Sequence, residues 1–350
     1  MRVLEEKEIV AKQIDPSKIM QVGTGFFASK TLLTAVNLDL FTLLAQGELS
    51  GKEVQSNLGL HNRAFYDFLD ALVALGFLSR KGTKDSAVYS NAADADQFLD
   101  KNKPSYIGGI LEMANNRLYP FWNNLEEGLK TGKPQNEIKL HGKDFFKELY
   151  ADEEKLHEFI NAMSGVQMGN FIEFSKNFDF SHFNSLCDIG GAGGYLTAQI
   201  AKDHPQINCI SFDLPEVSTI AADIIKNMGL EGKVKIQSGD FFVDKFPKAD
   251  MITMENILHD WGLEDKKMLI RKAYEALPEG GALVVIENII DDNRCENVFG
   301  LMISLNMLIE TEAGYDFTFA DFTKLVKEEG FNEASIIQLT GPTSAAIAYK

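Results

Sequence analysis

The sequence predicts an α/β protein in which a parallel sheet, covered by helices on both faces, follows a mainly helical N-terminal region. Before residue 183, apolar residues recur every three or four positions, as in amphipathic helices. From Phe183 onward, short apolar runs alternate with helical patterns, which is typical of successive strand and helix units. The 350 residues, 45% hydrophobic and 24% charged, are enough for two globular domains with large cores.

The N-terminal region is predicted to be a group of packed helices followed by a two-stranded ribbon. Residues 16–76 have helical periodicity, and "GFLSRKGTKDSAVYSN" (residues 76–91) indicates two short strands around a polar turn, which together form a winged-helix pattern. A DNA-binding regulator is one alternative, but the net charge of −17 opposes binding to polyanions, and residues 61–75 carry a single arginine. We expect no nucleic-acid or membrane partner, and a homodimer formed by the surplus apolar helix surface.

The next region is expected to hold two long amphipathic helices rich in Met and Phe, over residues 104–133 and 144–174. Such helices serve equally well as plain core or as the wall of an apolar ligand pocket. We therefore predict three parts of the chain: a dimerisation domain at 1–105, a helical pocket segment at 106–180, and a sheet domain at 181–350.

A glycine-rich loop follows the first of five predicted strands, which cover residues 185–190, 207–215, 234–242, 249–256 and 282–290. In "CDIGGAGGYL" the glycines let the backbone turn tightly and approach a ligand. The dinucleotide-binding spacing fails because Leu196 stands where a third glycine is needed, which disfavours the alternative of a nicotinamide dehydrogenase.

Two acids are predicted at the carboxyl ends of neighbouring strands. Asp213 ends the second apolar run and can accept both hydroxyl protons of a ribose. Asp240 ends the third, where it can bind an adenine amine while Phe241 lies against the adenine ring. This set suits S-adenosyl-L-methionine, a nucleoside with an amino acid at its other end. The alternative is that both aspartates only cap turns.

Five motifs in this order, "CDIGGAGGYL", "SFDLPEV", "SGDFF", "HDW" and "EALPEGGALVVIENII", make the chain similar to the S-adenosylmethionine-dependent O-methyltransferases of the caffeate type and their bacterial natural-product relatives. The resemblance covers essentially the whole chain. It implies a Rossmann-like class I methyltransferase sheet behind a winged-helix dimerisation domain, the product S-adenosyl-L-homocysteine, and no metal. The implied cofactor residues are Gly190, Gly191, Gly193, Asp213, Leu214, Gly239, Asp240 and Phe241.

The same resemblance implies that His259 accepts a proton and that Glu287 and Asp316 hold it in place. A phenol with a pKa of about 10 needs a base near neutral pH, and imidazole is the natural acceptor. The alternative is that His259 only starts a helix, with Asp260 as its cap. Glu255 and Phe317 depart from the plant enzymes, where a lysine and an arginine are usual, which weakens any transfer of their substrate choice.

The resemblance places the acceptor among five residues that could equally be ordinary helix packing: Phe145, Phe159, Met163, Asn306 and Met307. A flat, apolar, hydroxylated aromatic acceptor would suit them. Two other functions stay open: an S-adenosylmethionine-binding enzyme that does not methylate, such as a decarboxylase, hydroxylase or pericyclase, and an N- or S-methyltransferase.

The chain is expected to be cytoplasmic. No apolar run reaches the length of a membrane helix, and the N-terminus is charged rather than signal-like. Cys187, Cys209 and Cys295 fall in no CxxC pair, so we expect three reduced thiols and no zinc site.

Overall fold

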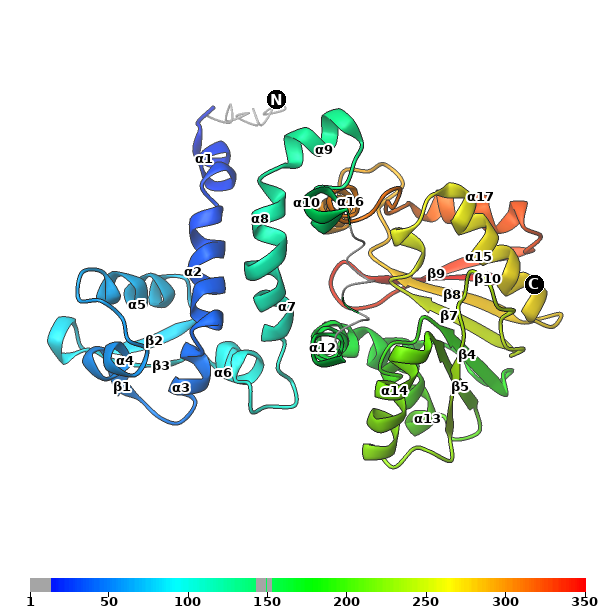
Figure 1. Ribbon diagram of the computed structural model, residues 1–350, viewed down its shortest axis with the longest axis horizontal. Helices are drawn as coiled ribbons and strands as arrows, with labels where there is room; N and C mark the ends of the chain where they lie inside the picture. The colour runs from blue at the N-terminus through cyan, green and yellow to red at the C-terminus, as the bar shows by residue number, and fades with distance from the viewer. Residues whose placement is uncertain (1–13, 143–148, 150–152) are drawn as a thin grey trace, which may run out of the picture. The chain divides into compact units, whose positions relative to one another are not determined.

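The computed structural model describes residues 14–142, 149 and 153–350, and it divides the chain into two compact units, Met1–Asn115 and Asn116–Lys350 (Figure 1). Within the described ranges, no helix is both long and apolar enough to cross a bilayer. The three domain ranges predicted from the sequence remain predictions.

The first unit packs short helices against a three-stranded antiparallel sheet of order β1–β3–β2. Its core is formed by apolar side chains from both, with Leu40, Leu69 and Tyr89 fully buried. The two predicted ribbon strands are confirmed as β2 and β3, and β1 is an addition. The elements are α1 (Ser17–Gly23), α2 (Phe26–Asn37), α3 (Leu40–Leu44), β1 (Leu49–Ser50), α4 (Gly51–Asn57), α5 (Phe65–Ala74), β2 (Leu78–Lys81), η1 (Lys84–Ser86), β3 (Val88–Asn91), α6 (Ala93–Leu99) and α7 (Gly108–Met113).

The prediction of one long helix over residues 104–133 is wrong. After α7 the chain makes a π-helical turn at Ala114–Leu118, followed by the short helices α8 (Tyr119–Trp122) and α9 (Leu125–Thr131). Pro120 explains the interruption, because proline has no N–H to donate and its ring crowds the preceding turn. The second predicted helix is present as α12 (Glu153–Asn177), which is preceded by α10 (Glu137–His141). Part of its predicted range lies outside the described residues.

A seven-stranded sheet of order β6–β5–β4–β7–β8–β10–β9 forms the centre of the second unit. The five predicted strands are confirmed and are all parallel: β4 (Ser185–Ile189), β5 (Asn208–Asp213), β6 (Val234–Ser238), β7 (Met251–Glu255) and β8 (Ala282–Glu287). The predicted parallel sheet is extended by two strands that the sequence did not predict, β9 (Glu333–Gln338) and β10 (Ser344–Tyr349). Strand β10 runs antiparallel to both of its neighbours.

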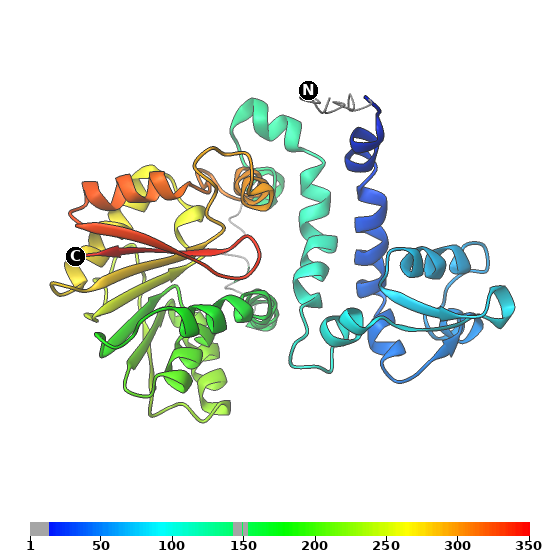
Figure 2. The ribbon, with the colours of Figure 1, turned by 180° about the vertical axis from the view of Figure 1, so that it is seen from behind.

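Helices cover both faces of this sheet (Figures 1 and 2). On one face α12, α13 (Tyr195–Asp203) and α14 (Pro215–Asn227) pack against alternate strand residues such as Leu186 and Val284. On the other face α15 (Leu263–Ala276) and α17 (Phe319–Glu328) pack against their neighbours in the strands, such as Cys187 and Val285. The remaining elements are η3 (Leu258–Asp260) and α16 (Val298–Glu310).

The strand order reverses between β4 and β7. The chain runs outward from β4 through β5 to β6, then returns to the other side of β4 as β7 and continues to β8. Side chains at the carboxyl ends of β4 and β7 therefore flank the crevice where open α/β sheets bind ligands. The glycine loop follows β4, and the segment that contains His259 follows β7.

Candidate active site

The glycine loop lies tightly against its neighbours at the end of β4. A Cβ atom on Gly190 would come to 2.3 Å from Ile257 Cδ1, and one on Gly191 would come to 2.4 Å from Ser211 Oγ. Gly194 has φ +73° and precedes α13, a conformation that favours glycine. Because glycine has no side chain, the backbone of the predicted loop can lie this close to Ile257 and Ser211. Gly193 is similarly confined, with a Cβ position 2.6 Å from the Tyr195 ring.

Asp213 lies against this loop. Its Oδ2 accepts a hydrogen bond of 2.8 Å from Ala192 N, and its Oδ1 accepts one of 2.7 Å from Leu214 N. Burial raises the pKa of Asp213 to about 6, although both hydrogen bonds act to lower it. Each carboxylate oxygen has a further lone pair, so the group can still accept two hydroxyl protons from a ligand. Gly239, another predicted cofactor residue, lies beside Asp213, because its backbone N donates a hydrogen bond of 2.8 Å to the backbone O of Asp213.

Asp240 does cap a turn, as the alternative interpretation has it. Its Oδ1 accepts a hydrogen bond of 2.8 Å from Phe242 N. The turn places Phe241 and Phe242 against Trp261, with ring centroids 5.9 and 4.6 Å from the indole. Because Cε1 of Phe241 is 3.9 Å from the position of a Cβ on Gly190, this aromatic group borders the glycine loop.

Trp261 was missed as a site residue, although it belongs to the "HDW" motif. Its Nε1 is buried and has no hydrogen-bond partner among the residues that the structure describes. A buried N–H without an acceptor costs free energy, which a ligand acceptor atom beside it would recover. An N–H donor, an aromatic ring, a carboxylate and a bare backbone are groups of the kinds that bind adenosine, and that Trp261, Phe241, Asp213 and the loop do so together is a prediction.

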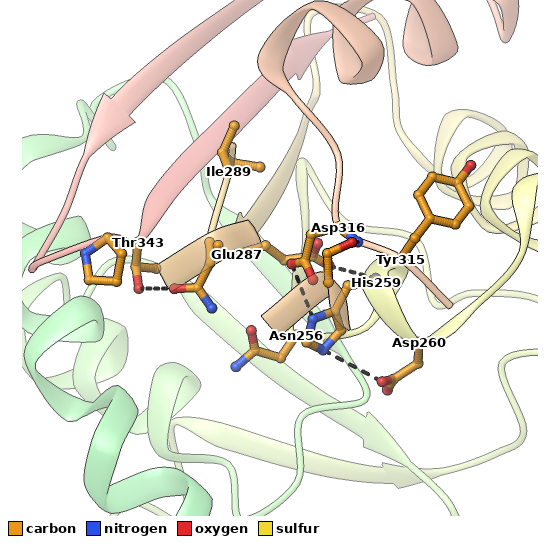
Figure 3. A network of polar contacts seen from close by, with 12 residues as sticks. Asn256, His259, Asp260, Glu287, Ile289, Tyr315, Asp316 and Thr343 are labelled. Carbon is orange, nitrogen blue, oxygen red and sulfur yellow. Dashed lines mark hydrogen bonds and ion pairs between the residues drawn. The ribbon is translucent and has the colours of Figure 1, made fainter. Parts of the chain in front are cut away.

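His259 is surrounded by three carboxylates (Figure 3). Its Nδ1 lies 3.4 Å from Asp316 Oδ1, its Nε2 lies 3.5 Å from Asp260 Oδ1, and its backbone N donates to Glu287 Oε1 at 3.1 Å. The structure thus brings the three predicted catalytic residues together. Glu287 contacts the backbone rather than the imidazole, while Asp260 faces the ring beside Asp316.

The alternative role of His259 and Asp260 as a helix start does not hold. Both residues lie in the short 3₁₀ turn η3, and α15 begins four residues after His259. The N-cap residue of α15 is Gly262, and no side chain caps that helix. The imidazole is therefore held by carboxylates from different parts of the chain and not by the helix that follows it.

The carboxylates make the imidazole a stronger base. Burial alone would lower the pKa of His259, but Asp260, Asp316 and Glu287 outweigh it and raise the pKa. For a carboxyl group burial has the opposite effect, and it raises the pKa of Glu287 and of Asp260. At the end of β7, burial raises the pKa of Glu255 to about 8, and the nearby charge of Asp188 adds to the effect. Such a group of buried acids and one base is typical of proton-transfer sites.

His259, Glu287 and Asp316 each offer a ligand atom, and these atoms lie within 4.8 Å of one another. The sequence offered no obvious ligand set, because the three residues come from separate segments. One imidazole and two carboxylates can bind a divalent ion. The buried ammonium of Lys266 interacts favourably with Glu287 and Asp316 and opposes a second cation there.

The residues predicted to line the acceptor pocket lie on two helices, apart from Phe145, which is outside the described residues. Half-buried Phe159 and Met163 belong to α12, and Phe159 packs near Leu214. Asn306 and the buried Met307 belong to α16, which contacts η3. Figures 1 and 2 both show α12 and α16 at the same end of the strands of the sheet.

Asn306 already has a partner, because its Oδ1 accepts a hydrogen bond of 2.8 Å from Trp122 Nε1. Any acceptor contact of Asn306 would therefore use its amide NH₂ group. The part that all five residues play toward an acceptor remains a prediction.

Two protein-family models match most of the chain. Residues 122–332 match the model of an O-methyltransferase domain, and residues 20–101 match that of an O-methyltransferase dimerisation domain. The sequence is 38% identical to the tetracenomycin polyketide synthesis 8-O-methyl transferase of Streptomyces glaucescens, over 96% of this chain and 97% of that protein. It is 31% identical to an N,N-dimethyltransferase of Streptomyces rimosus, over 89% and 90%.

Solved structures give the same likeness. The structure of human N-acetylserotonin methyltransferase in complex with S-adenosylmethionine superposes with a TM-score of 0.88 at 26% identity. The superposition covers 97% of this chain and 99% of the human one. The likeness thus extends over both units, and not over the sheet domain alone.

Proposed function

The chain belongs to the O-methyltransferase family, whose methyl donor is S-adenosylmethionine, and we propose that His259 is the general base that prepares an aromatic hydroxyl for methylation. The observation that carries this proposal is the placement of His259 between Asp316 and Asp260, with Glu287 on its backbone amide. The same cluster lies beside the point where strand order reverses, next to the glycine loop.

The cofactor, when bound, supplies an electrophilic methyl group on a positively charged sulfur. The residues that would hold it are those that the fit favours: Asp213 for the ribose hydroxyls, Phe241 against the adenine, and Trp261 Nε1 as a donor to an adenine nitrogen. The bare backbone at Gly190 and Gly191 leaves room for the rest of the molecule.

The proton transfer follows from the geometry of the ring. Asp316 lies 3.4 Å from Nδ1, which favours a proton on that nitrogen, so that Nε2 is the nitrogen left to accept the proton of the acceptor hydroxyl. Once protonated, Nε2 lies beside Asp260, and the imidazolium is stabilised by the surrounding carboxylates. A raised pKa brings the base closer to the pKa of about 10 of a phenol, which makes the transfer less unfavourable.

A hydroxylated, polycyclic aromatic molecule is the acceptor class that we infer. The relative from Streptomyces glaucescens is named for 8-O-methylation in polyketide synthesis, and another, from Streptomyces sahachiroi, for 3-O-methylation of a naphthoate. Phe159, Met163 and Met307 on α12 and α16 supply apolar surface suited to flat rings.

N-methylation is the second candidate, since the relative from Streptomyces rimosus is named an N,N-dimethyltransferase. Neutral amines are nucleophilic without a base, so the clustered acids around His259 favour oxygen. We further propose a homodimer formed through the dimerisation domain and a cytoplasmic location, in keeping with the free thiols of Cys187 and Cys209.

The test is methyl transfer to matched acceptors. The protein is incubated with methyl-labelled S-adenosylmethionine and with pairs of fused aromatics that carry either a hydroxyl or an amine at the same position. Label on the hydroxyl member supports the proposal, whereas label only on the amine would overturn it. Binding of S-adenosylhomocysteine, measured by calorimetry, shows separately that the cofactor site is intact.

A further inference from the structure

We propose that Lys266 is a positioning residue that ties the loop carrying His259 to the loop carrying Asp316 and balances the negative charge around the imidazole. This inference rests on the proposed role of His259. Lys266 touches neither acceptor nor cofactor in the proposed mechanism, and its effect would act entirely through the position and the charge of the base.

The ammonium group of Lys266 is bonded to both loops. The side chain is fully buried in the first turns of α15. Its Nζ donates to Trp261 O at 2.5 Å and to Tyr315 O at 3.0 Å. Trp261 lies two residues after His259, and Tyr315 immediately precedes Asp316. One cation therefore binds the backbone beside each of the two residues that form the contact between Nδ1 and Oδ1.

The third donor of the ammonium group is also satisfied. Nζ lies 3.6 Å from the centroid of the Tyr315 ring, within the range of a cation–π contact. A buried ammonium is stable only when its donors have partners, because desolvation otherwise favours the neutral amine. These contacts with two carbonyl oxygens and one aromatic face meet that condition, and within the described ranges no carboxylate forms an ion pair with Nζ.

Independent packing shows that the two loops are in close contact. A Cβ on Gly314 would lie 2.6 Å from His259 O and 2.7 Å from Asp260 O. A Cβ on Gly262 would lie 3.1 Å from Ala313 Cβ. At Gly314 and Gly262 the two loops leave no room for a side chain. Loss of the hydrogen bonds from Lys266 to both loops would therefore alter the position of Asp316 relative to His259.

The charge of Lys266 opposes that of the acids. Three carboxylates lie near both Lys266 and His259: those of Asp260, Glu287 and Asp316. A fourth, Asp265, lies near Lys266 on the same helix. Glu255, at the end of β7, lies near His259. Burial lowers the pKa of Lys266, while the four carboxylates near it act to raise it. Without this cation, the acids would act on His259 unopposed, and its pKa would rise further. The base would then be protonated, and inactive, at higher pH.

The test compares Lys266→Met, which removes the charge but keeps the chain length, with Lys266→Arg, which keeps the charge. The matched control is Lys267→Met, because the neighbouring Lys267 instead pairs with Glu328 at 2.8 Å on the surface. The readouts are the pH profile of kcat/KM, the NMR titration of the His259 ring and the affinity for S-adenosylhomocysteine.

We expect Lys266→Met to raise the pKa of His259 by about one unit and to shift the acidic limb of the pH profile to higher pH by the same amount. A nearby unit charge has an effect of this size at an effective dielectric constant of about 20. At neutral pH kcat should fall about tenfold, while affinity for S-adenosylhomocysteine stays within about threefold. Lys266→Arg should shift the limb by less than half as much, and Lys267→Met should leave it unchanged.

A folded Lys266→Met variant with the wild-type profile and titration would overturn the proposal. If that variant does not fold, Lys266→Gln and Lys266→Arg give the same comparison, and failure of all three to fold would show a purely structural role. The NMR titration needs no acceptor, so it separates this inference from the proposed function: a shifted His259 without methyl transfer would leave Lys266 supported and the acceptor class wrong.

Discussion

Oδ1 of Asp316 lies 3.4 Å from Nδ1 of His259, in a site where both side chains are almost completely buried. Neither oxygen of Asp316 meets hydrogen-bond geometry with any described residue, His259 Nδ1 included, so the contact with the imidazole is an ion pair. The charge of the carboxylate therefore acts on the imidazole when the ring is protonated. A carboxylate in this place fixes the tautomer of the ring and stabilises the imidazolium that forms when a proton arrives.

Asp316→Asn should lower kcat by about 10- to 10³-fold with little change in KM, because the amide can hold the wrong tautomer and cannot stabilise the imidazolium. The pKa of His259 should fall in the same variant. Steady-state kinetics and NMR titration measure the two effects. Asp292→Asn is the control, since Asp292 is outside the cluster and accepts a bond from Ala320 N. Equal kinetics for the two variants would remove Asp316 from the mechanism.

The rate should rise with pH. Because the folded protein raises the pKa of His259 above its usual value of about 6.5, the ring is protonated and unable to accept a proton below that raised pKa. We expect kcat/KM to increase about tenfold per pH unit on the acidic side and to level off at a midpoint clearly above 6.5. Two acceptors with different hydroxyl pKa values should share this midpoint. A midpoint at or below 6.5 would show that the carboxylates do not act on the base.

Trp261→Phe should weaken binding of S-adenosylhomocysteine about fivefold, the value of one hydrogen bond of about 1 kcal/mol. The reason is the buried Nε1, which has no partner within the described part of the chain. Calorimetry measures the affinity directly. The chain has two tryptophans, so Trp122→Phe is the matched control and should bind normally. Equal affinity in both variants would show that the indole N–H does not contact the cofactor.

Removal of metal ions should leave the methyl transfer rate unchanged. His259, Glu287 and Asp316 could bind a divalent ion, but a bound ion would occupy the imidazole that the mechanism needs and would be repelled by Lys266. The check is dialysis against a chelator followed by assay with and without added magnesium, manganese or zinc. Loss of activity that one of these ions restores would identify the cluster as a metal site instead.

The fold was predictable where the signal was local. Strands β4, β5, β7 and β8 are largely buried apolar runs that end in an acid or directly before a glycine, and these were found, as was the more exposed β6. Strands β9 and β10 were both missed. Strand β10, "SAAIAY", consists largely of small residues with little strand preference. Its position between β8 and β9 makes small, buried side chains suitable, but that position is a property of the whole sheet.

The site was predictable only in part, because its key contacts join distant segments. The motif pointed to His259, but only the folded chain shows that Glu287 bonds to its backbone. Lys266 and Lys267 are adjacent in "LEDKKM", and nothing in the sequence shows which of the two is buried. The rotation of α15 buries one between two loops and leaves the other to pair with Glu328.

The most direct test of the account is the single-turnover rate of His259→Ala, measured alongside its affinity for S-adenosylhomocysteine. The account predicts that methyl transfer to a phenolic acceptor falls by about 10² to 10⁴, the usual contribution of a general base, while cofactor affinity stays within a few fold. An unchanged rate in a variant that binds the cofactor normally would contradict it, and would mean that the acceptor reaches the site already ionised.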